Sequence, residues 1–231
     1  MHHRVRTVVA TPAILSFALL AGCVTTRGNE QVRQLAARVE SVQQQADLAQ
    51  QLTAAALQNL QKLTGRDFGG DALTAYEGLQ RAVADSAKQE GALRATLEPL
   101  QTAAERLFES WGSDLQGFDN AELHQRSQER LKSTRERYEG LVKVTLESLT
   151  AFSEINRNLR DHVRFFGRDL NHEALASVRG DVRDLGERVA VLQEKLGECR
   201  RSASAYADSI GLPSTPLTVP AMPAGEITRT K

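Results

Sequence analysis

Net charge, aromatic side chains, cysteine and, over most of its length, proline are scarce in this 231-residue chain. The formal net charge is +0. Proteins that bind nucleic acid usually carry a clear excess of basic residues, so the overall charge gives no reason to expect such a partner. Only 5% of the residues are aromatic, and Pro99 is the one proline between residues 24 and 210. Because Ala, Leu, Gln, Glu and Arg dominate this region, the composition predicts long helices with 3.5-residue patterning.

Cysteine occurs twice, at Cys23 and Cys199. If the thiol of Cys23 carries a lipid, no pair of thiols is left for an internal disulfide. Cys199 falls in a row of apolar residues at helical spacing, where cysteine packs as a small apolar side chain. We therefore expect Cys199 to be a core residue rather than a reactive thiol.

The N-terminal residues have the layout of a bacterial export signal. Arg4 and Arg6 give a positive start, and the apolar run Val8–Leu20 is about 13 residues long, too short to span a bilayer. Small residues then lead to Cys23. This order predicts a signal peptide over residues 1–22 rather than a transmembrane helix.

Leu20-Ala21-Gly22-Cys23 resembles the lipobox of bacterial lipoproteins. The resemblance implies that signal peptidase recognises Leu20, Ala21 and Gly22, and that a lipid is attached to the thiol of Cys23. Two or three acyl chains at one site anchor a protein stably. Val24 follows, instead of the aspartate that favours inner-membrane retention, which implies the periplasmic face of the outer membrane. The alternative is an ordinary secretory signal that ends near a cysteine.

Four stretches carry apolar residues that alternate three and four positions apart, which is the spacing of a coiled-coil seam. They predict helices over about 30–63, 71–111, 120–166 and 172–210. Pro99 removes one backbone donor and is expected to kink or weaken the second helix near Ala95. Polar side chains that precede the helices are expected to cap them, namely Asp71, Asp119 or Asn120, and Asn171.

We expect an all-α fold, an elongated antiparallel (up-down-up-down) four-helix bundle with coiled-coil-like heptad packing. Short connections between long amphipathic helices favour antiparallel neighbours, and the bundle would be about 50–65 Å long at 1.5 Å per residue. Residues 23–29 are expected to form a lipidated tether before the bundle of residues 30–210, and residues 211–231 a Pro-rich flexible tail. The alternative is a three-helix core with the alanine-rich first helix partly detached or pairing between protomers.

Four segments, taken in order, resemble a known family. They are Phe68-Gly69-Gly70-Asp71, Leu107-Phe108-Glu109-Ser110-Trp111, Ser133-Thr134-Arg135-Glu136-Arg137-Tyr138 and Leu170-Asn171-His172-Glu173-Ala174-Leu175-Ala176-Ser177. Their order and spacing resemble the bacterial lipoproteins of domain-of-unknown-function family 2959, over about residues 45–208. The turn at Gly167 and Arg168 departs from the lysine-histidine pair of that family. The resemblance implies a periplasmic helical lipoprotein and carries over no catalytic residue.

The sequence does not contain the usual catalytic and metal-binding patterns. A di-metal site in a helical bundle requires Glu-x-x-His, and no glutamate stands three residues before His124, His162 or His172. These histidines are interpreted as solvated or cap-associated. We expect no enzymatic activity, no metal site and no cofactor. A basic stripe on the third helix is expected to form salt bridges with acidic residues of the fourth; it comprises Arg157, Arg160, Arg164 and Arg168.

These observations predict a non-enzymatic, membrane-anchored periplasmic lipoprotein that is a structural spacer or protein-docking module in a Gram-negative envelope. The expected partners are the membrane, through lipid on Cys23, and an envelope protein, with no nucleic acid; self-assembly through the first helix is an alternative. A different function is small-molecule or metal binding at the bundle end around Phe68, Tyr76 and Phe166. The terminal Lys231 resembles the lysine by which murein lipoproteins are joined to peptidoglycan, and is a further candidate attachment site.

Overall fold

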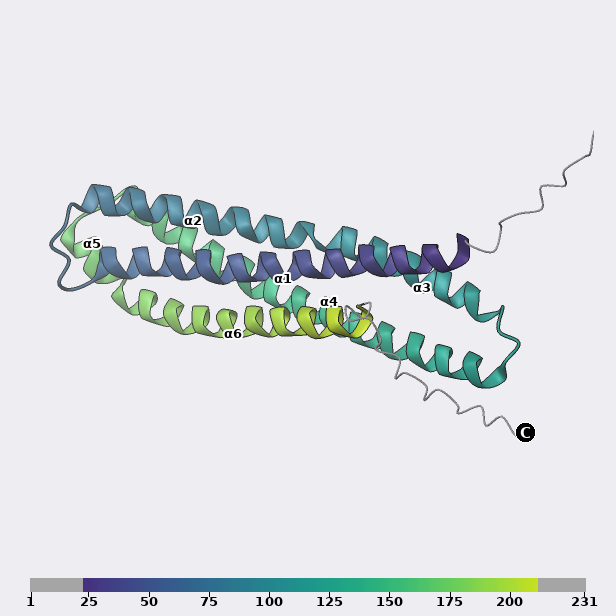
Figure 1. The fold of residues 1–231 in the computed structure, drawn as a ribbon. Helices are drawn as coiled ribbons and strands as arrows, with labels where there is room; N and C mark the ends of the chain where they lie inside the picture. Colours follow the sequence, from purple (N-terminus) through teal and green to yellow (C-terminus); the bar gives the residue numbers. More distant parts are fainter. Residues whose placement is uncertain (1–22, 212–231) are drawn as a thin grey trace, which may run out of the picture.

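The computed structural model describes residues 23–211, with side chains from Gly28 onward (Figure 1). The all-α class is confirmed, and these residues contain no β-strand. None of the helices has both the length and the apolarity needed to cross a membrane. The predicted signal peptide and all of the predicted tail except Gly211 lie outside the described residues. The helices are α1 (Cys23–Thr64), α2 (Ala72–Ala95), α3 (Leu97–Leu115), α4 (Ala121–Phe166), α5 (His172–Ser177) and α6 (Arg179–Ile210).

Helix α1 is continuous over 42 residues, about 63 Å at 1.5 Å per residue. It includes residues 23–29, so the predicted tether is helical in the structure. No proline interrupts the backbone before the apolar seam, which explains why the helix starts early. The described part of the predicted seam is almost wholly buried, which overturns the alternative with a detached first helix. The fully buried positions are Leu35, Val39, Val42, Ala46, Ala49, Thr53, Ala56, Leu60 and Leu63.

The predicted second helix is divided into α2 and α3 at Thr96. Pro99 has no N–H to offer the carbonyl of Ala95. The N–H of Thr96 bonds to the carbonyl of Leu93, three residues back, at 3.2 Å. Thr96 keeps right-handed helical angles, with φ −75° and ψ −20°, so the chain does not reverse here. The predicted weak point near Ala95 is confirmed.

Side-chain caps begin three of the helices, as predicted. Asp71 accepts hydrogen bonds from two backbone N–H groups of α2, at 3.2 and 3.1 Å. Asn120, rather than Asp119, accepts two from α4, at 3.0 and 3.1 Å. Asn171 accepts one from α5 at 2.9 Å. Each cap satisfies donors that have no partner within the helix, which fixes where the helix starts.

The predicted fourth helix is divided at Val178, where φ is −92° and ψ is 0°. The side chain of Arg179 donates to the carbonyl of Thr64 at 2.9 Å, so the division lies beside the end of α1. The described residues therefore form six helices where the sequence predicted four. The heptad pattern continues through Val178, and this valine is only 9% exposed. The sequence pattern therefore gives no sign of the break.

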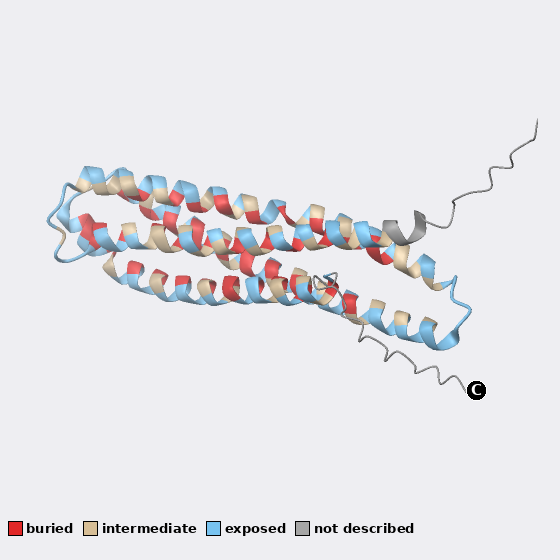
Figure 2. Ribbon diagram, viewed as in Figure 1, coloured by how far each residue is buried: buried red, intermediate tan, exposed pale blue. Residues whose placement is uncertain are grey.

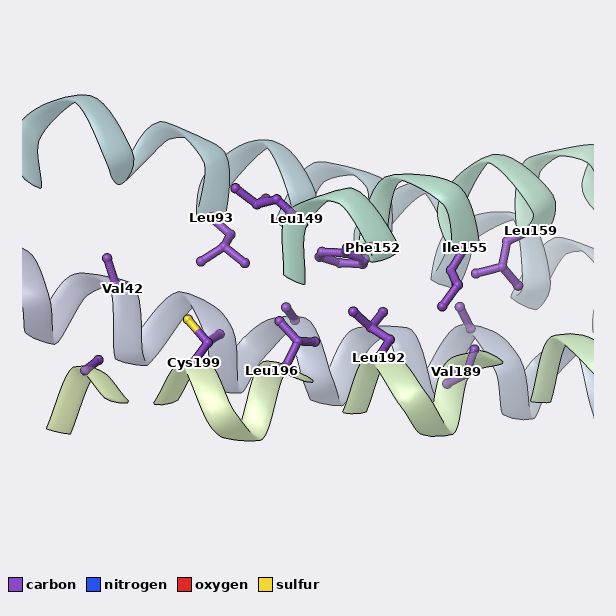
Figure 3. Close-up of a cluster of buried hydrophobic side chains, with 14 of the residues drawn as sticks. Val42, Leu93, Leu149, Phe152, Ile155, Leu159, Val189, Leu192, Leu196 and Cys199 are labelled. Carbon is purple, nitrogen blue, oxygen red and sulfur yellow. The ribbon is translucent and has the colours of Figure 1, made fainter. Parts of the chain in front are cut away.

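Helix α1 packs against α2, α3 and α6, and α4 packs against the same three helices. Buried residues form stripes along the long helices (Figure 2). In the close-up of the core, Phe152 of α4 faces Leu192 and Leu196 of α6 (Figure 3). Full burial of one such side chain contributes about 1.5–3 kcal/mol, so this core is the main source of stability.

Candidate functional site

The predicted attachment residues lie at or beyond the limits of the described structure. Leu20, Ala21, Gly22 and Lys231 lie outside it, and Cys23 is the first residue of α1. The start of α1 lies toward the same end of the molecule as the α3–α4 connection, and the α1–α2 connection lies at the other end (Figure 1). A lipid on Cys23 would therefore hold the molecule by the first of these ends.

The other end, where a binding site is predicted as an alternative, is packed around aromatic rings. The hydroxyl of Tyr76 donates to the carbonyl of Val163 at 3.1 Å and accepts from Gln80 at 2.9 Å. Phe166 is 1% exposed and meets Phe165 edge to face, with 5.5 Å between ring centroids. Tyr76 and Phe166 are thus engaged in intramolecular contacts.

A groove of about 450 Å³ lies beside this end, between α4 and the junction of α5 and α6. His162 on its wall is 8% exposed and its Nδ1 lies 2.9 Å from the carbonyl of Asn158, so this histidine is buried rather than solvated. Within the described part of the chain, no three metal-binding side chains cluster. The groove is lined by Asn158, Asp161, His162, Phe165, Ser177, Val178 and Asp181.

Cys199 is fully buried on α6, as the heptad pattern predicts. Its Sγ lies 3.3 Å from Oγ1 of Thr145 on α4. Burial raises the pKa of the thiol, and the contact with Thr145 offsets this only in part. A buried, protonated thiol is a poor nucleophile, so this position has a packing role.

The basic stripe of the third predicted helix does not pair as predicted. Arg164 pairs with Asp161 of its own helix, at 3.5 Å, because an acid one turn away is nearer than any on α6. Among the described residues, the ion pair that joins α4 to α6 is Lys195 with Glu147 at 3.8 Å, near the middle of both helices. Such exposed pairs contribute little to stability.

A second groove, of about 530 Å³, follows the contact between α3 and α4, and we name it the α3–α4 groove. At its floor Phe108 and Tyr138 meet edge to face, with centroids 5.6 Å apart and planes at 71°. Leu146 in its wall is 47% exposed, which is high for a large apolar side chain. The lining residues are Gln101, Glu105, Phe108, Tyr138, Glu139, Val142, Lys143, Leu146 and Glu147.

Acidic side chains border this apolar floor. Three glutamates line the groove, Glu105 from α3 and Glu139 and Glu147 from α4, against one lysine. Burial raises the pKa of Tyr138, and Glu105 and Glu139 raise it further because they disfavour a second negative charge nearby. At the same end of the groove the guanidinium of Arg135 lies 5.2 Å from the centroid of the Phe108 ring. The groove therefore favours positive charge beside apolar contact.

The sequence profile of a family described as "Protein of unknown function (DUF2959)" matches residues 23–210. The chain belongs to the DUF2959 family. The match is longer than the resemblance over about residues 45–208 that the sequence motifs indicated, and it takes in all of α1. A comparison with curated proteins gives no match.

Two of the four segments that carry the resemblance meet at the α3–α4 groove of this DUF2959 protein. Phe108 comes from the segment on α3, and Tyr138 and Arg135 come from the segment on α4. Further along the same pair of helices, Nε1 of Trp111 donates to Oγ of Ser127 at 2.9 Å. The contact between α3 and α4 is thus made by aromatic and polar groups rather than by leucines alone.

The sequence did not reveal the α3–α4 groove in this DUF2959 protein. The predicted seam of the third helix passes through Leu141, Thr145 and Leu149, and Leu146 lies beside it. The sequence does contain one sign of the groove. Leu146 is a large apolar residue outside the seam, with Val142 four positions before it and acidic residues nearby. Its exposure depends on how α3 and α4 pack, which the spacing within one helix does not give.

Proposed function

We propose that this DUF2959 protein is a non-enzymatic, lipid-anchored protein on the periplasmic face of the outer membrane of a Gram-negative bacterium. It acts as a structural spacer or protein-docking module. The observation that carries the proposal is a helix about 63 Å long that begins at Cys23, the cysteine of the segment that resembles a lipobox. A partner bound on the side of such a rod is kept at a fixed distance from the membrane.

We also infer that the six helices act as four antiparallel arms, namely α1, α2 with α3, α4, and α5 with α6. The right-handed helical angles at Thr96 and Val178 support this inference, because the chain does not turn back at either position. Arms that share one heptad-packed core bend little, which suits a spacer.

Labelling of cells with radioactive palmitate, followed by membrane fractionation, tests the anchor. The unmodified chain is expected to carry label and to sediment with the outer membrane, whereas Cys23→Ala carries none. Cys199→Ala is the matched control and keeps the label, since its thiol is buried. Label that persists in Cys23→Ala would refute the anchor.

Attachment of Lys231 to peptidoglycan is a separate proposal that does not affect the first. Muramidase digestion followed by mass spectrometry is expected to leave a muropeptide on the C-terminal peptide. An unmodified C-terminal peptide would leave the lipid as the one proposed anchor.

Small-molecule binding is the second candidate function, and the groove beside His162 favours it. A metal is not favoured there, because no three metal-binding side chains cluster among the described residues. Two carboxylates, Asp161 and Asp181, line this groove together with the imidazole. A rise in melting temperature with a small diamine such as putrescine, which Asp161→Asn and Asp181→Asn abolish, would support it. An unchanged melting temperature with the diamine would argue against small-molecule binding there.

A further inference from the structure

We propose that the α3–α4 groove binds an amphipathic helix whose apolar stripe is flanked by lysine or arginine side chains. This inference rests on the proposed docking function and names the class of partner. The groove is open along two antiparallel helices, so a third helix can rest between them as helices do in a bundle.

The apolar floor has the spacing that a helical partner requires. Tyr138, Val142 and Leu146 stand four residues apart on α4 and therefore form one stripe, about 12 Å long at 1.5 Å per residue. Apolar residues at positions i, i+4 and i+7 of a second helix span nearly the same length. Leu146 is the anchor of the stripe, because it has the most apolar surface left to bury.

The charges of the groove select a basic partner. Glu105 lies on the α3 side of the stripe, and Glu139 and Glu147 lie on the α4 side with Lys143 between them. Three acids against one base leave the lining net negative, so basic residues of a docked helix would meet Glu105 on one flank and Glu139 on the other. Glu139 has no ion-pair partner among the described side chains, whereas Glu147 shares Lys195 at 3.8 Å. Such complementarity gives specificity and orientation more than affinity.

The aromatic end of the groove already accepts a cation. The guanidinium of Arg135 lies over the ring of Phe108, 5.2 Å from its centroid. Arg135 belongs to α4 itself and covers this ring, and Phe108 is only 6% exposed. A basic side chain of the partner would therefore meet the carboxylate of Glu105 beside this end rather than the ring face itself.

A peptide titration tests the proposal. The probe is a fluorescein-labelled synthetic helix of 18 residues with leucine at heptad a and d positions and lysine on the flanks. Its charge-reversed twin carries glutamate on the flanks. The full lipidated chain is reconstituted in phosphatidylcholine nanodiscs, and empty nanodiscs give the background. Fluorescence anisotropy is expected to give a dissociation constant for the lysine peptide that is at least about tenfold lower than for the glutamate peptide. One pair of matched charges at each flank is sufficient for that ratio.

Groove variants locate the binding. Leu146→Glu is expected to weaken the lysine peptide at least about tenfold, whereas Val191→Glu, at a 53% exposed position on α6, leaves it unchanged. Glu105→Lys combined with Glu139→Lys is expected to reverse the preference between the two peptides. Circular dichroism melts confirm that each variant is folded.

Three results would overturn the proposal. They are equal affinity for the two peptides, equal effects of Leu146→Glu and Val191→Glu, or a dimer of the unliganded chain that Leu146→Glu dissociates, which would make a second copy the occupant. The titration does not depend on which membrane holds the protein or on a native partner. A failed titration would therefore not contradict lipid attachment shown by the palmitate labelling. The groove proposal and the anchor are thus tested apart.

Discussion

Ser86 on α2 and Asn156 on α4 meet inside the core, where Oγ of Ser86 donates to Oδ1 of Asn156 at 2.7 Å. Both residues are fully buried. The amide Nδ2 of Asn156 also donates to a carboxylate oxygen of Glu90 at 3.1 Å. One buried amide thus fixes the register of α2 against α4 at a point where apolar packing alone would allow sliding.

Asn156→Ala is expected to destabilise the fold by about 2–3 kcal/mol, because it leaves the Ser86 hydroxyl buried without its acceptor. Ser86→Ala alone is expected to cost about 1 kcal/mol. The double variant should lose less than the sum of the two, by about 1 kcal/mol, since the partners are removed together. Urea unfolding of the four proteins measures this coupling, and strict additivity would contradict the bond.

Gly167 is required by a close approach at the end of α4. A Cβ at this position would lie 2.7 Å from the hydroxyl oxygen of Tyr76 and 3.3 Å from the carbonyl of Val163. Gly167→Ala is therefore expected to destabilise by about 1–3 kcal/mol, the usual cost of overpacking. Combination with Tyr76→Phe removes the nearer atom and should recover part of the loss. A Gly167→Ala protein that melts at the original temperature would contradict this geometry.

Glycines at Gly91 and Gly140 offer the opposite case. A Cβ at either position would meet nothing within 4 Å, and both lie inside helices, α2 and α4. Alanine there is expected to stabilise by about 0.5–1 kcal/mol each, because glycine loses more backbone entropy on folding. Thermal melts of the single variants check this, and a lower melting temperature in either would show that the position has an unrecognised role.

Stability is expected to fall at alkaline pH. Burial raises the pKa of Tyr206 above its ordinary value of 10.0, and Tyr138 raises it further. The unfolded chain ionises this phenol first, so stability is full below about pH 10 and decreases as the pH rises beyond it. The buried thiol of Cys199 acts in the same direction above its ordinary pKa of 9.0.

Tyr206→Phe tests this dependence directly. The hydroxyl of Tyr206 has no hydrogen-bond partner among the described residues, so its removal should leave stability at neutral pH unchanged or raise it by up to about 1 kcal/mol. The fall in stability between about pH 9 and 11 should become shallower. Urea titrations across this range give both quantities, and an unchanged slope would contradict a buried neutral phenol.

The features of the fold that the sequence predicted depend on interactions between residues close together in the chain. The break near Ala95 follows from the missing N–H of Pro99, and the caps follow from side chains that reach their own backbone. The break at Val178 was not predictable in this way, since that valine continues the heptad pattern and the bond from Arg179 to Thr64 joins residues far apart in sequence.

The polar core contacts were missed for a related reason. The spacing around Ser86 does not predict its contact with Asn156, because the two residues are 70 positions apart. The α3–α4 groove is likewise a property of two helices together. Spacing within one helix gives its buried face, but it does not give which polar groups meet or where two helices leave apolar surface open.

The intact mass of the protein extracted from the outer membrane tests the central claim most directly. The account predicts a chain that starts at Cys23, with a diacylglyceryl group on the thiol and a further acyl chain on the amino end. A chain that retains residues 1–22, or one that starts at an unmodified Cys23, would contradict it.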